Sequence, residues 1–264
     1  MPGIKSLFLL VGTAFAGLLL MHLGAAKAFF PKTQEVAEKL NANYEKLGSW
    51  RVHLQLNGTR DQEIRCWRKK GLWRQEWIDS ATASNRVLCA GVGSGRRISA
   101  VFPVTADIPF PPLHLDWVRA PSKEWQRLQI EDQIKSYQFL DDRPCIVLGA
   151  KYGQLERSQV WIDLERYVPL RLITPSGIIW RWTEYYSLGN HPLPTRLRIE
   201  FPQGEIFAFN LSWRQVGTDM SRSHFSPASI REDFGPTDES GLKDSHFRFL
   251  LNNLPPNRAG SASW

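Results

Sequence analysis

Cysteine is scarce in this 264-residue chain, which contains only Cys66, Cys89 and Cys145. Three widely spaced cysteines are too few for the disulfide framework of a small secreted protein. One strand is expected between Cys66 and Cys89, which would hold them roughly 9 to 10 Å apart, beyond the reach of a disulfide. We therefore expect free, buried thiols.

Clustered metal ligands and complete catalytic motifs are lacking as well. The histidines are isolated and show no metal-ligand spacing. No Lys-Ser or Lys-Thr pair follows residues 91–95, as a phosphate-binding loop requires, and Ser94 lacks the flanking glycines of a nucleophile elbow. The acidic pairs at 131–132 and 141–142 fit solvated turns better than a general acid and base. We expect no enzyme activity, no metal site and no cofactor.

A strong charge of one sign is also absent. The chain has 33 basic and 26 acidic residues, a formal excess of +7. The basic residues alternate with apolar ones along expected strands, so a solvated outer face explains them better than a nucleic-acid site. Transient attraction to an anionic membrane surface is compatible with this charge.

The one long apolar run, Leu7 to Leu23, follows Lys5 and precedes Ala26-Lys27-Ala28. A basic start, an apolar stretch and small residues two apart predict a signal peptide, residues 1–28, cleaved after Ala28. No cysteine follows the run, so we expect no lipid anchor. The alternative is an uncleaved membrane anchor, because a run of about 17 residues is at the short limit for spanning a bilayer.

Beyond the signal, the apolar pattern changes from helical to alternating. Residues 33–47 predict one amphipathic helix, which Thr33 caps and Gly48 ends. Strands are expected at residues 50–56, 63–69, 72–78, 86–90, 97–102, 134–140, 145–150, 157–164, 168–174, 178–187, 195–201 and 205–216. Short turns between neighbours make an antiparallel meander, and one sheet of about 11–12 strands has to curl. The fold class is therefore mainly β, in one domain over residues 29–216.

Two segments interrupt or follow this meander. Residues 103–133 are rich in proline and predict a short helix at 115–128, interrupted at Pro121, that can lie across the open side of the sheet as a lid. The tail, residues 217–264, is rich in Ser, Pro, Gly and Asn. We expect the tail to be partly disordered, with one short docking helix near residues 242–254.

The alternating strands predict one apolar and one polar face, and 12% of the residues are aromatic. One helix and one lid segment are too little to cover so many strands, so a large apolar cavity suited to a lipid is expected; the alternative is an ordinary packed core. Leu115 and Trp117 are expected on the lid. The expected cavity residues are Trp50, Leu54, Leu170, Leu172, Trp180, Trp182, Leu197, Ile199, Phe207 and Phe209.

Three short stretches resemble the periplasmic lipoprotein carriers of the LolA/LolB type: RKKGLWR at 68–74, VWID at 160–163 and PLRL at 169–172. The order of elements over residues 33–216 is similar too. The resemblance implies an unclosed β-barrel with helices plugging the opening and acyl chains on the concave face. It places Arg68 or Lys69 nearest to an arginine that helps to hold the lid of the family's carrier. The proline that follows that arginine in the family is missing here.

The resulting functional expectation is a periplasmic, unanchored carrier of a lipid or of lipoprotein acyl chains, with inner- and outer-membrane partner proteins. Burying acyl chains supplies affinity of about 0.8 kcal/mol per CH₂ without catalysis. The alternative is an envelope assembly or stress-sensing protein that binds a protein partner through a sheet edge or the basic face.

Overall fold

The computed structural model describes residues 30–59, 61–79, 86–95, 97–102, 121–234 and 247–254. The expected signal peptide and the expected lid residues Leu115 and Trp117 lie outside these residues.

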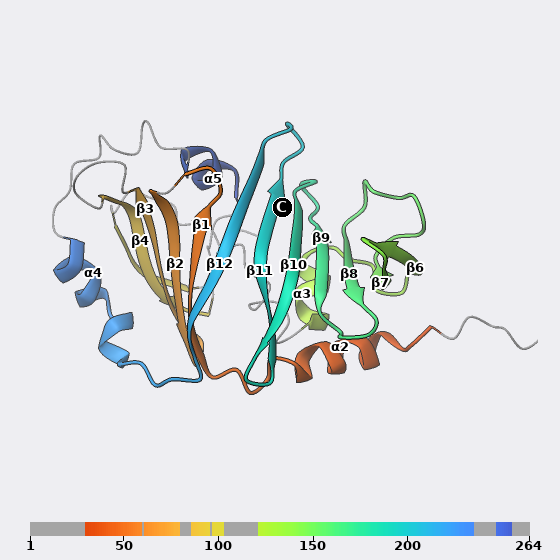
Figure 1. Cartoon of the computed structure of the whole chain (residues 1–264), viewed down its shortest axis with the longest axis horizontal. Helices are drawn as coiled ribbons and strands as arrows, with labels where there is room; N and C mark the ends of the chain where they lie inside the picture. The colour runs from red at the N-terminus through yellow and green to blue at the C-terminus, as the bar shows by residue number, and fades with distance from the viewer. Residues whose placement is uncertain are drawn as a thin grey trace, which may run out of the picture.

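Twelve antiparallel strands form a single open sheet, as the alternating pattern predicted. Their order is β5-β4-β3-β2-β1-β12-β11-β10-β9-β8-β7-β6, so β5 and β6 are the two edges (Figure 1). The strands are β1 (Ser49–Leu56), β2 (Gln62–Lys69), β3 (Leu72–Asp79), β4 (Arg86–Ser94), β5 (Arg97–Phe102), β6 (Lys135–Leu140), β7 (Arg143–Leu148), β8 (Gln159–Asp163), β9 (Pro169–Ile173), β10 (Ile179–Leu188), β11 (His191–Glu200) and β12 (Ile206–Val216).

Two meanders make up this sheet, β1 to β5 and β6 to β12. They are joined where β1 pairs with β12, and Leu54 lies opposite Leu211 at this seam. Sequence neighbours pair everywhere else in the sheet, so short turns suffice within each meander.

Gly91 and Gly93 belong to a strand, so the turn expected over residues 91–95 is shorter than expected and includes Gly95. β4 continues to Ser94, and Gly93 lies opposite Trp73 of β3. A Cβ atom at Gly93 would lie 2.4 Å from the Trp73 ring and 2.1 Å from the carbonyl oxygen of Arg97. Gly93 therefore makes room for an indole ring inside the sheet.

β11 begins at His191, four residues earlier than expected, and includes Pro192 and Pro194. Residues 191–194 of β11 pair with β10 alone. The pairing of β11 with β12 covers only Arg196 to Glu200. A proline is tolerated where its nitrogen faces no neighbouring strand. The Tyr44 hydroxyl donates to the Pro192 carbonyl at 2.9 Å, and the Trp213 indole donates to the Pro194 carbonyl at 2.8 Å.

Two helices begin or end differently from expectation. Helix α2 (Thr33–Ala42) is shorter than 33–47 because the chain turns after Ala42, and the Tyr44 N–H donates to the Asn41 carbonyl at 2.8 Å. Thr33 does not cap it; its hydroxyl donates to the Asp132 carbonyl at 3.0 Å. Helix α3 (Pro121–Arg127) begins at Pro121, which was expected to interrupt a helix. Proline suits a first helical position because no hydrogen bond needs its missing N–H there.

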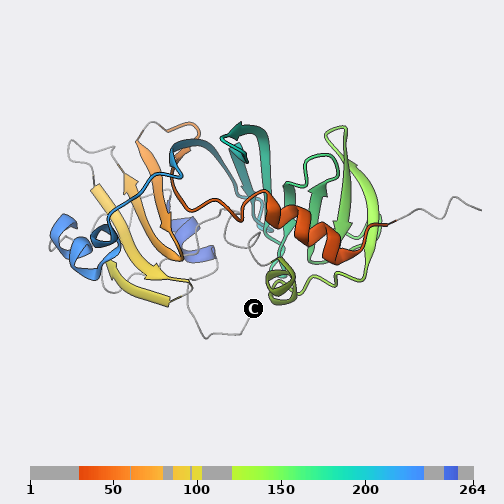
Figure 2. The same cartoon turned by 90° about the horizontal axis from the view of Figure 1, so that it is seen from below.

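The segment after β12 contributes the 3₁₀ helix η2 (Arg222–Phe225) and the helices α4 (Pro227–Phe234) and α5 (Phe247–Asn253). α4 packs Ile230 and Phe234 against Val92 and Phe102 on the outer face of the first meander. α2, α3 and α5 lie on the inner side of the sheet (Figure 2). No helix within the described residues is long and apolar enough to span a membrane.

All three cysteines are free and buried, as expected. Cys66 is on β2 and Cys89 on β4, and β3 lies between them. Burial is the main cause that raises the pKa of the Cys145 thiol to about 12, so this thiol is protonated at neutral pH.

Candidate functional site

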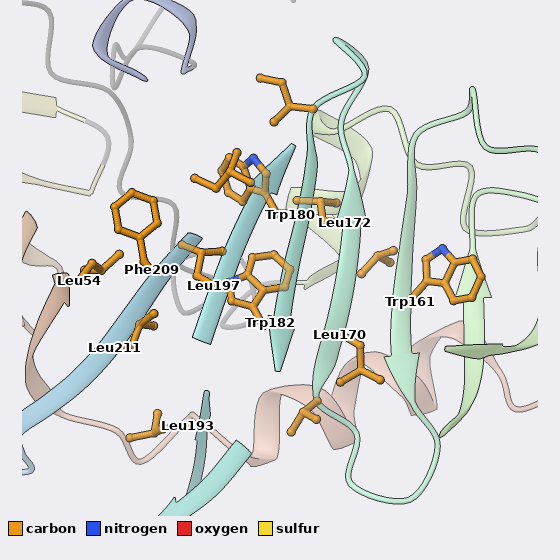
Figure 3. Packing of buried hydrophobic residues seen from close by; sticks show 14 of the residues in the cluster. Leu54, Trp161, Leu170, Leu172, Trp180, Trp182, Leu193, Leu197, Phe209 and Leu211 are labelled. Carbon is orange, nitrogen blue, oxygen red and sulfur yellow. The ribbon is translucent and has the colours of Figure 1, made fainter. Parts of the chain in front are cut away.

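The inner face of the sheet carries a continuous apolar surface. Strand register places the side chains of Leu172, Trp180, Ile199 and Phe207 in one row across β9 to β12. Figure 3 shows such inner side chains, among them Trp182, projecting from neighbouring strands. Alternation along each strand creates this surface, since every second residue points inward.

All ten predicted cavity residues lie in or against one hydrophobic cluster. Nine of them are buried, and Phe207 is partly buried. Trp50 lies on β1, three strands from Trp180 on β10, and packs edge-on against Trp213, with ring centroids 5.7 Å apart. The structure therefore brings the predicted residues together on one face.

Three short helices cover this face. α2 buries Val36 and Leu40, and α3 buries Trp125 in the same cluster. α5 lies over the inner face of the first meander and of β12: Phe247 packs edge-on against Trp77 at 5.2 Å between ring centroids.

The position of α5 was not expected, because the sequence indicated only a docking helix without its partner surface. Phe249 of α5 stacks on Phe207 at 5.7 Å and packs edge-on against Phe201 at 4.9 Å. Leu250 and Leu254 are buried in the same cluster. Part of the predicted cavity surface is therefore occupied by the chain's own C-terminal helix.

Unused hydrogen-bond donors lie within this apolar surface. The indole Nε1 atoms of Trp50, Trp125 and Trp180 are buried and have no hydrogen-bond partner among the described residues. Buried indoles usually have a partner, as Trp161 does through Gln159 Oε1 at 2.8 Å. A buried donor without a partner costs about 1–3 kcal/mol. These N–H groups can therefore donate to an acceptor that no described residue supplies.

The two residues expected to hold a lid point to opposite faces of β2. Arg68 lies opposite Trp50 and Trp73, so it faces inward. Lys69 faces outward, where its Nζ lies 2.5 Å from Asp219 Oδ1 and donates also to the Met220 carbonyl. Lys69 therefore fastens the segment after β12. The expected lid is residues 103–133, and its first part, residues 103–120, lies outside the described residues.

A polar cluster that the sequence did not reveal fixes α4 to the outer face. Arg74 is only 2% exposed, and its Nη2 lies 2.6 Å from both Glu76 Oε1 and Asp233 Oδ2. Its Nη1 donates to Ser229 Oγ at 3.1 Å. Burial raises the pKa of Glu76, and the adjacent Arg74 charge opposes this shift. No sequence pattern pairs β3 with a helix about 160 residues later.

Metal-binding chemistry is not indicated by the described part of the chain. It contains no group of three or more His, Cys, Asp or Glu side chains that could hold a metal ion.

No protein-family model and no curated protein matches the chain. Among solved structures, a LolA superfamily protein, NE2245 from Nitrosomonas europaea, is 15% identical over 76% of this chain and 100% of its own, with a TM-score of 0.44. A DUF1329 family protein from Desulfovibrio piger is 12% identical over 76% and 100% of the two chains, with a TM-score of 0.42. LprF from Mycobacterium bovis is 10% identical over 73% and 96%, with a TM-score of 0.28. The family that the sequence motifs resemble is thus represented among the solved structures to which this chain is similar.

Proposed function

We propose that the inner face binds acyl chains and that the protein is a non-enzymatic periplasmic carrier of a lipid or of a lipoprotein's acyl groups. The observation that carries the proposal is the continuous apolar inner face, from Trp50 to Trp180, covered by short helices. Inner- and outer-membrane proteins would then deliver and receive the cargo. Export would depend on the N-terminal apolar run.

The covering helices are short enough to be displaced. α2 has 10 residues, and α3 and α5 have 7 each. Helices of this length are marginal in water without their packing partners. The contacts of Phe249 and Leu250 are apolar, so an acyl chain entering the same place would replace them with contacts of the same kind. Each buried CH₂ group would add about 0.8 kcal/mol to binding.

The unpartnered indoles favour an acyl ester or amide over a plain hydrocarbon. Trp180 Nε1 is a buried donor without an acceptor among the described residues, and the Trp180 ring packs edge-on against the Trp182 ring, with centroids 6.1 Å apart. A carbonyl at the head of an acyl chain would accept this hydrogen bond and remove its desolvation cost. Trp50 Nε1 offers the same chemistry on β1.

Extraction and binding measurements test the carrier function. The purified protein is extracted with organic solvent, the extract is weighed by mass spectrometry, and a fluorescent fatty-acyl ester is titrated into the delipidated protein. A stoichiometric lipid, or saturable probe binding, supports the proposal. A lipid-free protein that also fails to bind the probe contradicts it.

Two matched variants locate the site. Trp180→Phe keeps the ring apolar and removes the inner-face N–H, so it should weaken ester binding about tenfold. Trp161→Phe is the control, because Trp161 lies opposite Arg171 on the other face and its N–H already has a partner. Equal losses in both variants would exclude the inner face as the site.

The edge strand β6 supports a second candidate function, binding of a protein partner. Phe139 is 75% exposed there, and Tyr137, stacked on Phe30 at 4.4 Å, is 39% exposed. An unpaired strand edge with exposed aromatic side chains can accept an added strand. Phe139→Glu should then abolish capture of an envelope partner and leave acyl-ester binding unchanged. If Phe139→Glu leaves capture intact, the edge is not the contact surface.

A further inference from the structure

Three arginines lie directly opposite one another on the outer face of the second meander. Arg171 on β9 pairs in register with Arg181 on β10, which pairs in register with Arg198 on β11. These three strands lie side by side in Figure 1. We refer to Arg171, Arg181 and Arg198 as the arginine row.

The arginine row carries more positive charge than its neighbours neutralise. Arg198 Nε donates to Glu200 Oε1 at 3.0 Å, and Arg181 Nε lies 3.3 Å from the same oxygen without the alignment of a hydrogen bond. Across the described residues, Glu200 is the one carboxylate paired with the row. Three guanidinium groups against one carboxylate leave two positive charges uncompensated. Like charges directly opposite one another destabilise a sheet.

Arg171 is the most deeply placed member of the row. It is 7% exposed, its guanidinium lies 5.4 Å from the centroid of the Trp161 ring, and its Nε has no hydrogen-bond partner. Burial, and next the charge of Arg181, lower the pKa of Arg171. A buried cationic donor that lacks an acceptor is costly unless an anion supplies one.

Two other outer-face arginines have acidic partners of their own. Arg196, one row away on β11, pairs with Glu184 at 2.8 Å, and Arg65 on β2 pairs with Glu63. The arginine row differs from these pairs, because its three guanidinium groups share the single carboxylate of Glu200 within the described residues.

We propose that the arginine row is a binding site for a phosphate group. Guanidinium groups bind phosphate oxygens through paired, charge-assisted hydrogen bonds. A phosphate monoester carries about −1.5 to −2 charges at neutral pH, which matches the excess on the row. The phosphate can belong to a free phosphate compound or to a lipid headgroup, whose phosphodiester carries one negative charge and would neutralise half of the excess. The row lies on the face opposite the apolar inner surface, so it can be tested independently of acyl binding.

Thermal unfolding of the full protein in inorganic phosphate tests the site. Phosphate should raise the unfolding temperature above that in chloride of equal ionic strength, since a ligand of the folded state stabilises it. Arg181→Gln should weaken phosphate binding at least tenfold, and without phosphate it should unfold no earlier than the parent protein because like charges are removed. Arg196→Gln is the matched control and should keep the phosphate effect.

Vesicle binding distinguishes the two sources of phosphate. If phosphatidylglycerol vesicles retain the parent protein but not Arg181→Gln, and phosphatidylcholine vesicles retain neither, the ligand is an anionic lipid headgroup. If inorganic phosphate alone binds, it is a free phosphate compound. The proposal is overturned if neither binds, if acetate stabilises the protein as much as phosphate, or if Arg196→Gln loses as much affinity as Arg181→Gln.

Discussion

Phe249 of α5 stacks on Phe207 of β12, with ring centroids 5.7 Å apart and ring planes 22° from parallel. Phe207 is one of the residues that the sequence assigned to a lipid cavity. The C-terminal helix thus covers part of the surface on which we propose that acyl chains bind. A ligand and α5 would compete for the surface around Phe207. The stability of α5 on the sheet would therefore influence the affinity for the ligand.

Weakening α5 should therefore favour the ligand. Phe249→Ala removes the ring that contacts Phe207 and Phe201, which should lower the free energy of unfolding by about 1–3 kcal/mol and raise affinity for an acyl ester severalfold. Urea unfolding and probe titration measure the two effects. Phe139→Ala serves as control, because Phe139 is 75% exposed and far less of its surface is buried by folding. Lower affinity in Phe249→Ala would mean that α5 forms part of the binding site instead of blocking it.

The Arg74 cluster should be among the most sensitive polar sites. Arg74→Met leaves Glu76 buried without its 2.6 Å partner, which should cost about 3–5 kcal/mol of stability in urea unfolding. Arg74→Met combined with Glu76→Gln should recover part of this loss, because the unpaired charge is gone. Arg196→Met, at an exposed ion pair, should cost no more than about 1 kcal/mol. Equal costs in Arg74→Met and Arg196→Met would show that the cluster does not hold α4.

His224 should make stability depend on pH. Burial, and next the charge of Arg74, lower the pKa of His224 to about 4, below its ordinary value of 6.5. Between these values the unfolded chain binds a proton that the folded chain does not, so stability should fall as the pH is lowered from about 6.5 to about 4. His224→Gln should reduce the slope of the unfolding temperature plotted against pH between about pH 4 and pH 6.5. At pH 8 the imidazole is neutral in both the folded and the unfolded state, so a difference in stability measured there reports the change in packing and not the change in proton binding. An unchanged slope in the variant would rule out His224 as its source.

Gly93 should tolerate no side chain. Gly93→Ala would place a Cβ atom 2.1 Å from the carbonyl oxygen of Arg97, a backbone atom that cannot move aside easily. We expect a loss of about 1–3 kcal/mol or more, measured by urea unfolding. Gly48→Ala is the control, since a Cβ atom there would have no neighbour within 4 Å. A neutral Gly93→Ala variant would indicate that β4 can shift away from Trp73.

Local pattern predicted the sheet well because alternation is a strong signal where one face is buried. Trp180 and Trp182 share one parity and Arg181 stands between them, so the pattern alone distinguishes the inner from the outer face of this strand. The same reasoning placed the β4–β5 turn too early, since glycine usually marks a turn and Gly93 instead gives space to Trp73 within the strand.

Features that depend on distant contacts could not be predicted. The docking of α4 through Arg74 and of α5 through Phe249 joins segments far apart in the sequence, and short helices carry little signal of their own. The arginine row also needed the strand register, because spacing alone does not show that Arg171, Arg181 and Arg198 are opposite one another.

The seam between the two meanders has a consequence for how the chain folds. β1 ends at Leu56 and β12 begins at Ile206, so the strands that join the sheet are separated by most of the domain. Closing so long a loop is entropically costly and slows folding. The hairpins within each meander can form early, because their strands are neighbours in the sequence. The two meanders can pair only after β12 is available. The rate-limiting step of folding should therefore be the pairing of β1 with β12.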